Sequence, residues 1–228
     1  MSERENILAR VREALKETAH VPGSYGHEPL AASAHSSAAG AQKWLPKVGD
    51  SFAEQLALFQ TNAAELKADF QIFANRDELK ATLAKISATE NWKRIASHEG
   101  ELTDFVSDAL GLPVCSTDGG YDVHEMEACD AGISECDALI AQTGSVLVTS
   151  RSAGGRALSV LPPHHVVIAR REQLVADLPA AFALVQEKYA PNFPSMISFI
   201  TGPSRTGDIE RILVLGAHGP KKLTILCF

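Results

Sequence analysis

The ten residues Thr201–Glu210 bring together the groups from which an anion site is built. Gly202 and Gly207 allow backbone angles that other residues avoid, so backbone amides can face a ligand. Arg205 lies between them and can hold a carboxylate or a phosphate through two parallel hydrogen bonds. The sequence therefore predicts an anion-binding loop at 201–210. The alternative is a tight turn in which Arg205 pairs with a neighbouring acid such as Asp208.

A second glycine turn, Thr143–Ser145, lies between two β-rich runs earlier in the chain. Ligands of open α/β sheets bind at the carboxyl ends of strands, and both turns follow runs that we expect to be strands. We expect the following residues to converge on a ligand: Thr143, Gly144, Ser145, Gly202, Ser204, Arg205, Thr206, Asp208 and His218. His218 is a weak candidate for a proton donor, because a histidine before Gly219-Pro220 can also simply fill a turn.

The cysteine and histidine spacings predict no metal or cofactor in this chain. None of the cysteines has the paired spacing of zinc or iron–sulfur ligands, and free thiols in a reducing compartment are expected. They are Cys115, Cys129, Cys136 and Cys227. The pair His164-His165 lacks a third ligand at a fitting distance, and we expect one side chain to face the core and the other to face solvent.

Composition excludes several functional classes. The 228 residues carry a net charge of −7, which disfavours binding to nucleic acid because phosphate neutralisation needs a basic surface. No apolar run approaches the roughly 20 residues of a membrane-spanning helix. The charged N-terminus lacks the apolar segment of a signal peptide. A cytoplasmic protein without a membrane span is expected.

The apolar pattern predicts alternating helices and strands. Helices are expected at 51–68, 77–87, 101–110 and 172–189, and strands at 70–74, 94–97, 112–116, 166–169 and 195–200. Such alternation predicts an α/β fold with a mainly parallel sheet flanked by helices. The Thr143–Ser145 turn is expected to join two paired strands or to interrupt one bulged strand. Residues 213–220 and 223–228 are expected to close the sheet as a hairpin.

The first fifty residues differ from the rest. Residues 2–19 have the spacing of an amphipathic helix, and the stretch up to residue 50 is rich in Ala, Ser, Gly and His, as in a partly disordered linker. The expected organisation is an N-terminal helix with a flexible linker over 1–50 and one α/β domain over 51–228.

Four motifs in the second half occur in a specific order. They are Gly132–Ser145, Leu161–Val166, Thr201–Glu210 and Gly216–Pro220. Together they resemble the LUD-domain family, whose namesakes are the lactate-utilisation C proteins. The resemblance covers roughly residues 51–228 and implies an α/β fold akin to the NagB/RpiA/CoA-transferase-like group.

The resemblance also implies a function. It suggests the C subunit of a system that oxidises L-lactate to pyruvate together with two partner subunits that carry the iron–sulfur clusters. An accessory or co-catalytic role is expected, because family members often have Glu where this chain has Gln142, and an amide cannot act as a general base. The alternative is a stand-alone enzyme or a ligand-sensing module that binds a phosphate- or carboxylate-bearing molecule.

Overall fold

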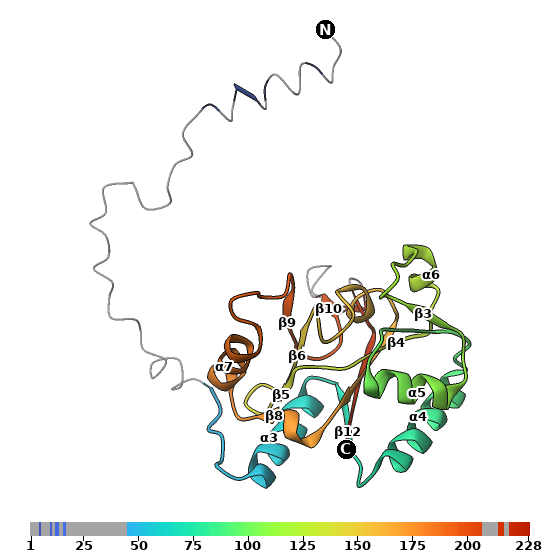
Figure 1. Cartoon of the computed structure of the whole chain (residues 1–228). Helices are drawn as coiled ribbons and strands as arrows, with labels where there is room; N and C mark the ends of the chain where they lie inside the picture. The colour runs from blue at the N-terminus through green and yellow to red at the C-terminus, as the bar shows by residue number, and fades with distance from the viewer. Residues whose placement is uncertain are drawn as a thin grey trace. The chain divides into compact units, whose positions relative to one another are not determined.

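The computed structural model describes residues 45–206, 214–216 and 219–228, together with Glu5, Arg10, Arg12, Glu13 and Lys16 (Figure 1). The chain divides into two compact units, 1–44 and 45–228. In the first unit, Glu5, Arg10, Arg12 and Glu13 have helical backbone and Lys16 lies in a turn, and the other residues of the predicted helix and linker up to residue 44 lie outside the described residues. No helix within the described parts is both long and apolar enough to cross a bilayer.

The second unit is organised around a six-stranded parallel sheet. Its order is β1 (Asp69–Ile72), β12 (Lys222–Cys227), β7 (His164–Ala169), β4 (Ala131–Ser134), β2 (Ile95–Ser97) and β3 (Val114–Ser116). Every strand pair in it is parallel, which confirms the predicted α/β class. The predicted C-terminal hairpin is wrong, because β12 lies between β1 and β7 and pairs with both in parallel.

A four-stranded sheet lies against the first. Its order is β8 (Leu174–Val175), β5 (Ala138–Ile140), β6 (Ser145–Thr149) and β9 (Ile197–Ile200). A separate two-stranded ribbon is formed by β10 (Arg205–Thr206) and β11 (Val214–Leu215). β5 and β6 are antiparallel, so the predicted turn between paired strands is confirmed. β4 leads through residues 135–137 into β5, and β7 leads through the 3-10 turn η2 (Arg171–Gln173) into β8. Adjacent strands of one sheet thus continue as adjacent strands of the other.

Helices complete the layers on both sides (Figure 1). α4 (Arg76–Glu90) and α5 (Glu101–Leu110) pack on one face of the large sheet, where Leu83 and Val106 meet Ile168. α3 (Phe52–Glu65) and the small sheet share a core with the opposite face. α7 (Leu178–Tyr189) packs on the small sheet, and α6 (Val123–Glu127) and η1 (Ala157–Ser159) share a small core with β2 and β3.

Local capping explains where the helices begin and end. Ser51 and Glu54 form a capping box at the start of α3, and Gly111 ends α5 with a left-handed φ of 61°. The helix predicted over 172–189 begins only at Leu178, because Asp177 caps it and Pro179 occupies its first turn.

The expectation that one histidine of the pair faces solvent is wrong. His164 and His165 are both buried, because β7 is a central strand of the parallel sheet and both faces of the sheet are covered there. The strand predicted at 195–200 is β9, whose side chains are exposed or half-buried because it lies at the edge of the small sheet.

Candidate functional site

The structure brings two of the predicted glycine turns together. β6 pairs with β9, and the hydroxyls of Ser145 and Thr201 lie 2.8 Å apart. A Cβ atom on Gly144 would lie 2.7 Å from the Ala63 amide nitrogen of α3, and φ there is 63°. Gly202 has a φ of 85° and meets the backbone of Leu66 in the same way. Both glycines therefore allow their turns to pack closely against the end of α3.

The remaining predicted site residues are spread along the following segment. Arg205 and Thr206 form β10, and the Ser204 amide donates to the Pro220 carbonyl oxygen at 2.9 Å. Asp208 and His218 lie outside the described residues. The anion site at 201–210 stays a prediction.

Gln142, at the end of β5, is buried. Its amide nitrogen donates to the Pro46 carbonyl oxygen at 3.3 Å, and its amide oxygen has no partner among the described residues. The backbone oxygen of Gln142 accepts a hydrogen bond from Asn62 of α3 at 3.0 Å. Gln142 therefore links α3 to the segment that precedes it.

The carboxyl edge of the large sheet carries a different set of polar residues. β2 and β4 are neighbours in the sheet. The chain continues from β2 to β3 on one side of this pair, and from β4 to β7 on the other side. Open α/β sheets bind ligands at such a change of direction. The residues that follow these strand ends are His98, Glu99, Glu135 and Arg170.

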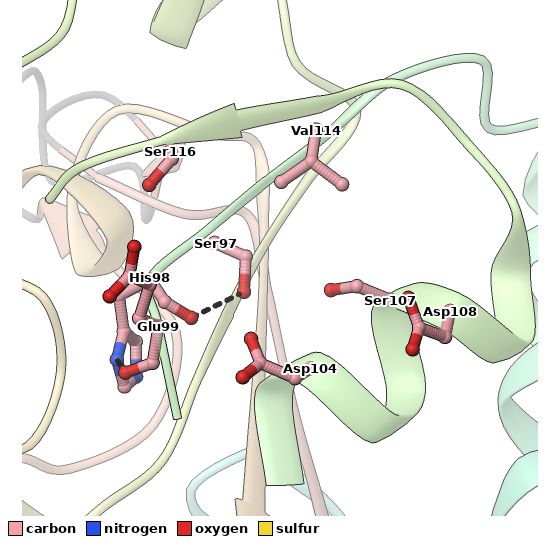
Figure 2. A pocket seen from close by; sticks show the side chains of 8 residues that line it. All are labelled: Ser97, His98, Glu99, Asp104, Ser107, Asp108, Val114 and Ser116. Carbon is pink, nitrogen blue, oxygen red and sulfur yellow. Dashed lines mark hydrogen bonds between the residues drawn. The ribbon is translucent and has the colours of Figure 1, made fainter. Parts of the chain in front are cut away.

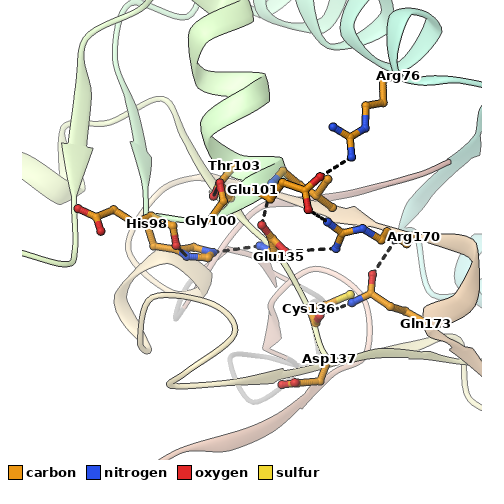
Figure 3. Close-up of polar contacts among 12 residues, drawn as sticks. Arg76, His98, Gly100, Glu101, Thr103, Glu135, Cys136, Asp137, Arg170 and Gln173 are labelled. Atoms are coloured by element: carbon orange, nitrogen blue, oxygen red, sulfur yellow. Dashed lines mark hydrogen bonds and ion pairs between the residues drawn. The ribbon is translucent and has the colours of Figure 1, made fainter.

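His98 joins the ends of β2 and β4 (Figure 3). Its Nε2 accepts a hydrogen bond from the Glu135 amide at 3.1 Å, and its Nδ1 lies 2.9 Å from the Glu99 carbonyl oxygen. Because an amide can only donate and a carbonyl can only accept, the imidazole proton lies on Nδ1. His98 is buried and fixed at both ring nitrogens.

Glu135 caps α5 from another strand. The residue before α5, Gly100, has no side chain to cap the helix, and Oε1 of Glu135 accepts a hydrogen bond from the Leu102 amide at 2.8 Å. A Cβ atom on Gly100 would lie 2.6 Å from that oxygen, so a larger residue there would displace the Glu135 carboxylate from the cap. Oε2 of Glu135 lies 3.7 Å from the Arg170 guanidinium.

Arg170 extends this contact into a chain of ion pairs at the surface (Figure 3). Arg170 pairs with Glu101 at 2.7 Å, and Glu101 also pairs with Arg76. The hydrogen bond from Arg76 and the charge of Arg170 lower the pKa of Glu101. Glu101 is 62% exposed, so these pairs mainly orient the arginines.

Asp137 lies below this edge as a fully buried carboxylate. It accepts hydrogen bonds from Lys188, Tyr189 and Ser152, each at 2.6 Å. Burial alone would raise the pKa of Asp137, but the three donors outweigh it and lower the pKa below its usual value. Asp137 therefore fixes α7 and the loop after β6 as an ionised anchor.

The loop after β6 lies over the ends of β2 and β3. Thr149 Oγ1 accepts hydrogen bonds from the Arg151 and Ser152 amides. Gly154 has a φ of 60°, and a Cβ atom there would lie 2.4 Å from the Cβ of His98. Beneath the loop is a cavity of about 320 Å³, whose lining includes His98, Glu99, Glu135, Arg151, Arg170 and Lys188.

A second cavity of about 480 Å³ lies between β2, β3 and α5 (Figure 2). Its lining includes Ser97, Glu99, Asp104, Ser107, Asp108 and Ser116. Among the described residues, no group of three histidines, cysteines or acids is placed to hold a metal ion. The first cavity is the stronger candidate, because it lies at the change of strand direction and contains both cations and hydrogen-bond acceptors.

Sequence reasoning missed this cavity. The signal was present in His98-Glu99-Gly100-Glu101, which follows one predicted strand and begins a predicted helix. Arg170, next to the predicted strand 166–169, was a second signal. The glycine turns, which lie in and beside the small sheet, gave the stronger sequence signal, and the site was therefore predicted there.

Comparisons with known proteins give the family. The LUD domain matches residues 123–227, which include Glu135, Asp137, Arg151, Arg170 and Lys188. A crystal structure described as a DUF162 family protein from Deinococcus radiodurans has a TM-score of 0.58 at 22% identity. It covers 78% of this chain and 99% of that chain, and the likeness shows the fold.

Relatives with curated names extend the match. Lactate utilization protein C of Geobacillus kaustophilus is 37% identical over 106 residues, which span 46% of this chain and only 44% of that protein. The protein of the same name from Anoxybacillus flavithermus is 30% identical over 158 residues, covering 67% of this chain and 70% of that protein. The chain therefore belongs to the LUD-domain family of the lactate utilisation protein C type.

Proposed function

We propose that this protein acts in lactate utilisation, as an accessory or co-catalytic subunit of a system that oxidises L-lactate to pyruvate. The observation that carries the proposal is the similarity to lactate utilization protein C of Anoxybacillus flavithermus over two thirds of both chains. The cavity under the loop after β6 supports it, since cations and acceptors at a strand edge suit a small organic acid.

Electron transfer is assigned in this proposal to iron–sulfur partner subunits. The four cysteines of this chain are buried. In the part of the chain that the structure describes, no group of three histidines, cysteines or acids is placed to hold a metal ion, so the clusters are assigned to other subunits. The loop at 201–210, with Arg205, is proposed as a further anion-binding surface of the subunit.

Growth and affinity purification test the proposal. Deleting the gene should abolish growth on L-lactate as sole carbon source and leave growth on pyruvate intact. A tagged chain purified from lactate-grown cells should bring down a cysteine-rich partner with the broad visible absorbance of iron–sulfur clusters. Normal growth of the deletion strain on L-lactate would refute the function, and a colourless chain purified alone would refute the partners.

A stand-alone enzyme acting on a small carboxylate or phosphate ester is the second candidate. It is favoured by the cavity under the loop after β6, which offers cations for an anionic substrate and hydrogen-bond acceptors beside them. Turnover of such a substrate by the isolated protein would support it over the subunit role.

A further inference from the structure

We propose that the cavity at the carboxyl ends of β2, β4 and β7 binds the carboxylate group of a small organic acid, which Arg151 and Lys188 contact directly. The inference names the ligand class of this cavity. It rests on the proposed function for the choice of L-lactate and pyruvate as probes.

Arg151 is the first of two cations in the cavity that have hydrogen-bond donors left for a ligand. Arg170 is engaged by Glu101 and Glu135, whereas Arg151 forms no ion pair with a carboxylate of the described residues. Its guanidinium lies 5.7 Å from the centre of the Tyr189 ring, and it donates no hydrogen bond to any other residue that the structure describes. A carboxylate can therefore pair with Arg151 through two parallel hydrogen bonds.

Lys188 supplies a second positive charge on the cavity wall. Its ammonium group donates one hydrogen bond to Asp137, and the side chain is 52% exposed. An ammonium group has three donors, so two remain for a ligand. Asp137 is a positioning residue, because it is fully buried and acts on the ligand only by holding Lys188 and Ser152.

The backbone that carries Arg151 is held in place before any ligand binds. Thr149 Oγ1 accepts the Arg151 amide proton, and Ser152 donates its hydroxyl proton to Asp137. Two residues further on, Gly154 lies directly against His98. Such preorganisation lowers the entropy lost when a ligand is bound.

The acids of the cavity do not oppose this assignment. Glu101 is neutralised by Arg76 and Arg170, and Glu135 is engaged by the Leu102 amide and by Arg170. Glu99 is exposed to water, as Arg151 is, so the charges of both are screened. The hydrogen-bond donors that Arg151 and Lys188 have left therefore favour a ligand with an anionic group that they can contact directly.

Calorimetric titration of the full chain tests the site with three probes: L-lactate, pyruvate and inorganic phosphate. The wild-type protein should bind at least one of the two acids with a Kd of roughly 1 mM or lower. Arg151→Ala should weaken that binding about tenfold or more, the usual effect of a lost charge-assisted contact. Arg156→Ala removes the same charge from the same loop outside the cavity and should bind like wild type.

Three results would overturn the inference: no binding of either acid at millimolar concentration, unchanged affinity in Arg151→Ala, or binding of phosphate alone. Arg151 is exposed, so its variant should keep the wild-type Tm, which verifies folding. The two proposals can fail separately. Acid binding that depends on Arg151, in a protein whose deletion does not affect growth on L-lactate, refutes the function and keeps the site.

Discussion

The backbone amide of Glu135 donates a hydrogen bond to Nε2 of His98 at 3.1 Å, and this bond joins the ends of β4 and β2. These are the neighbouring strands whose onward connections run in opposite directions. The Glu135 side chain then caps α5, and the loop carrying Gly154 packs on His98. Three separate segments are therefore held at the rim of one cavity.

The first prediction concerns the cap of α5. Glu135→Ala removes the acceptor of the Leu102 amide and one contact of Arg170, and should lower the free energy of unfolding by about 1–2 kcal/mol. Glu135→Gln keeps an acceptor oxygen and should lose less than half as much. Urea unfolding of both variants measures the difference. Equal losses would show that Glu135 does not act as a cap.

The second prediction concerns the buried anchor. Asp137→Ala leaves Lys188, Ser152 and Tyr189 without their shared acceptor and should cost about 2–4 kcal/mol of stability. Lys188→Ala should cost less, since Asp137 keeps two hydroxyl donors. Chemical unfolding measures both variants. A larger loss of stability for Lys188→Ala than for Asp137→Ala would contradict the central role assigned to Asp137.

The lowered pKa of Asp137 also predicts that the stability of the protein depends on pH in the acid range. Its pKa is lowered in the folded protein, so its contribution is complete above the unfolded pKa of about 4 and is lost as pH falls towards the lower folded value. Asp137→Asn should therefore show a shallower loss of stability than wild type below about pH 4. Parallel stability curves for the two proteins would exclude this contribution.

The third prediction concerns His165. Burial, with a smaller contribution from His164, lowers the pKa of His165 to about 3, and its Nδ1 has no partner among the described residues. Below about pH 6.5 the unfolded chain binds a proton at this histidine that the folded protein excludes. The free energy of unfolding therefore decreases as the pH is lowered, by up to about 1.4 kcal/mol per pH unit. His165→Gln should flatten this slope between pH 6.5 and 4.

A matched control for His165 is His124→Gln, because the His124 side chain is 91% exposed. Thermal unfolding across this pH range should show the wild-type dependence for the control. A wild-type slope in His165→Gln would contradict the prediction.

The fourth prediction concerns the loop over the cavity. Gly154→Ala would place a methyl group 2.4 Å from both His98 Cβ and Thr117 Oγ1 at a positive φ, and should cost about 1–3 kcal/mol. Gly119→Ala meets no atom within 4 Å and should stay within about 0.5 kcal/mol of wild type. Differential scanning calorimetry compares the two variants. Similar Tm values would show that the loop does not pack on His98.

Much of the fold could be predicted from the chain because local signals and tertiary packing agree there. The helix at 101–110 has the predicted bounds, since apolar spacing and the terminal Gly111 both specify it. The strand predicted at 223–228 lies one residue earlier, at 222–227, and its predicted pairing was wrong. Strand partners depend on long-range packing, and short apolar strands carry no signal for which neighbours they take.

The candidate site was harder to predict, because its residues come from five separate segments of the chain. Arg151 and Arg170 are ordinary charged residues in sequence, and they meet at one cavity only because the ends of β6 and β7, in different sheets, lie close together in the fold. Gly144 and Gly202 are easier to recognise in the sequence. The structure shows that a glycine is present at each of these turns because the turn packs closely against α3.

The most direct test of a functional cavity is complementation of the deletion strain during growth on L-lactate. The gene encoding Arg156→Ala should restore the wild-type growth rate, whereas Arg151→Ala, expressed at the same level, should restore little or none. Full growth with Arg151→Ala would show that the cavity at His98 and Glu135 does not serve lactate utilisation.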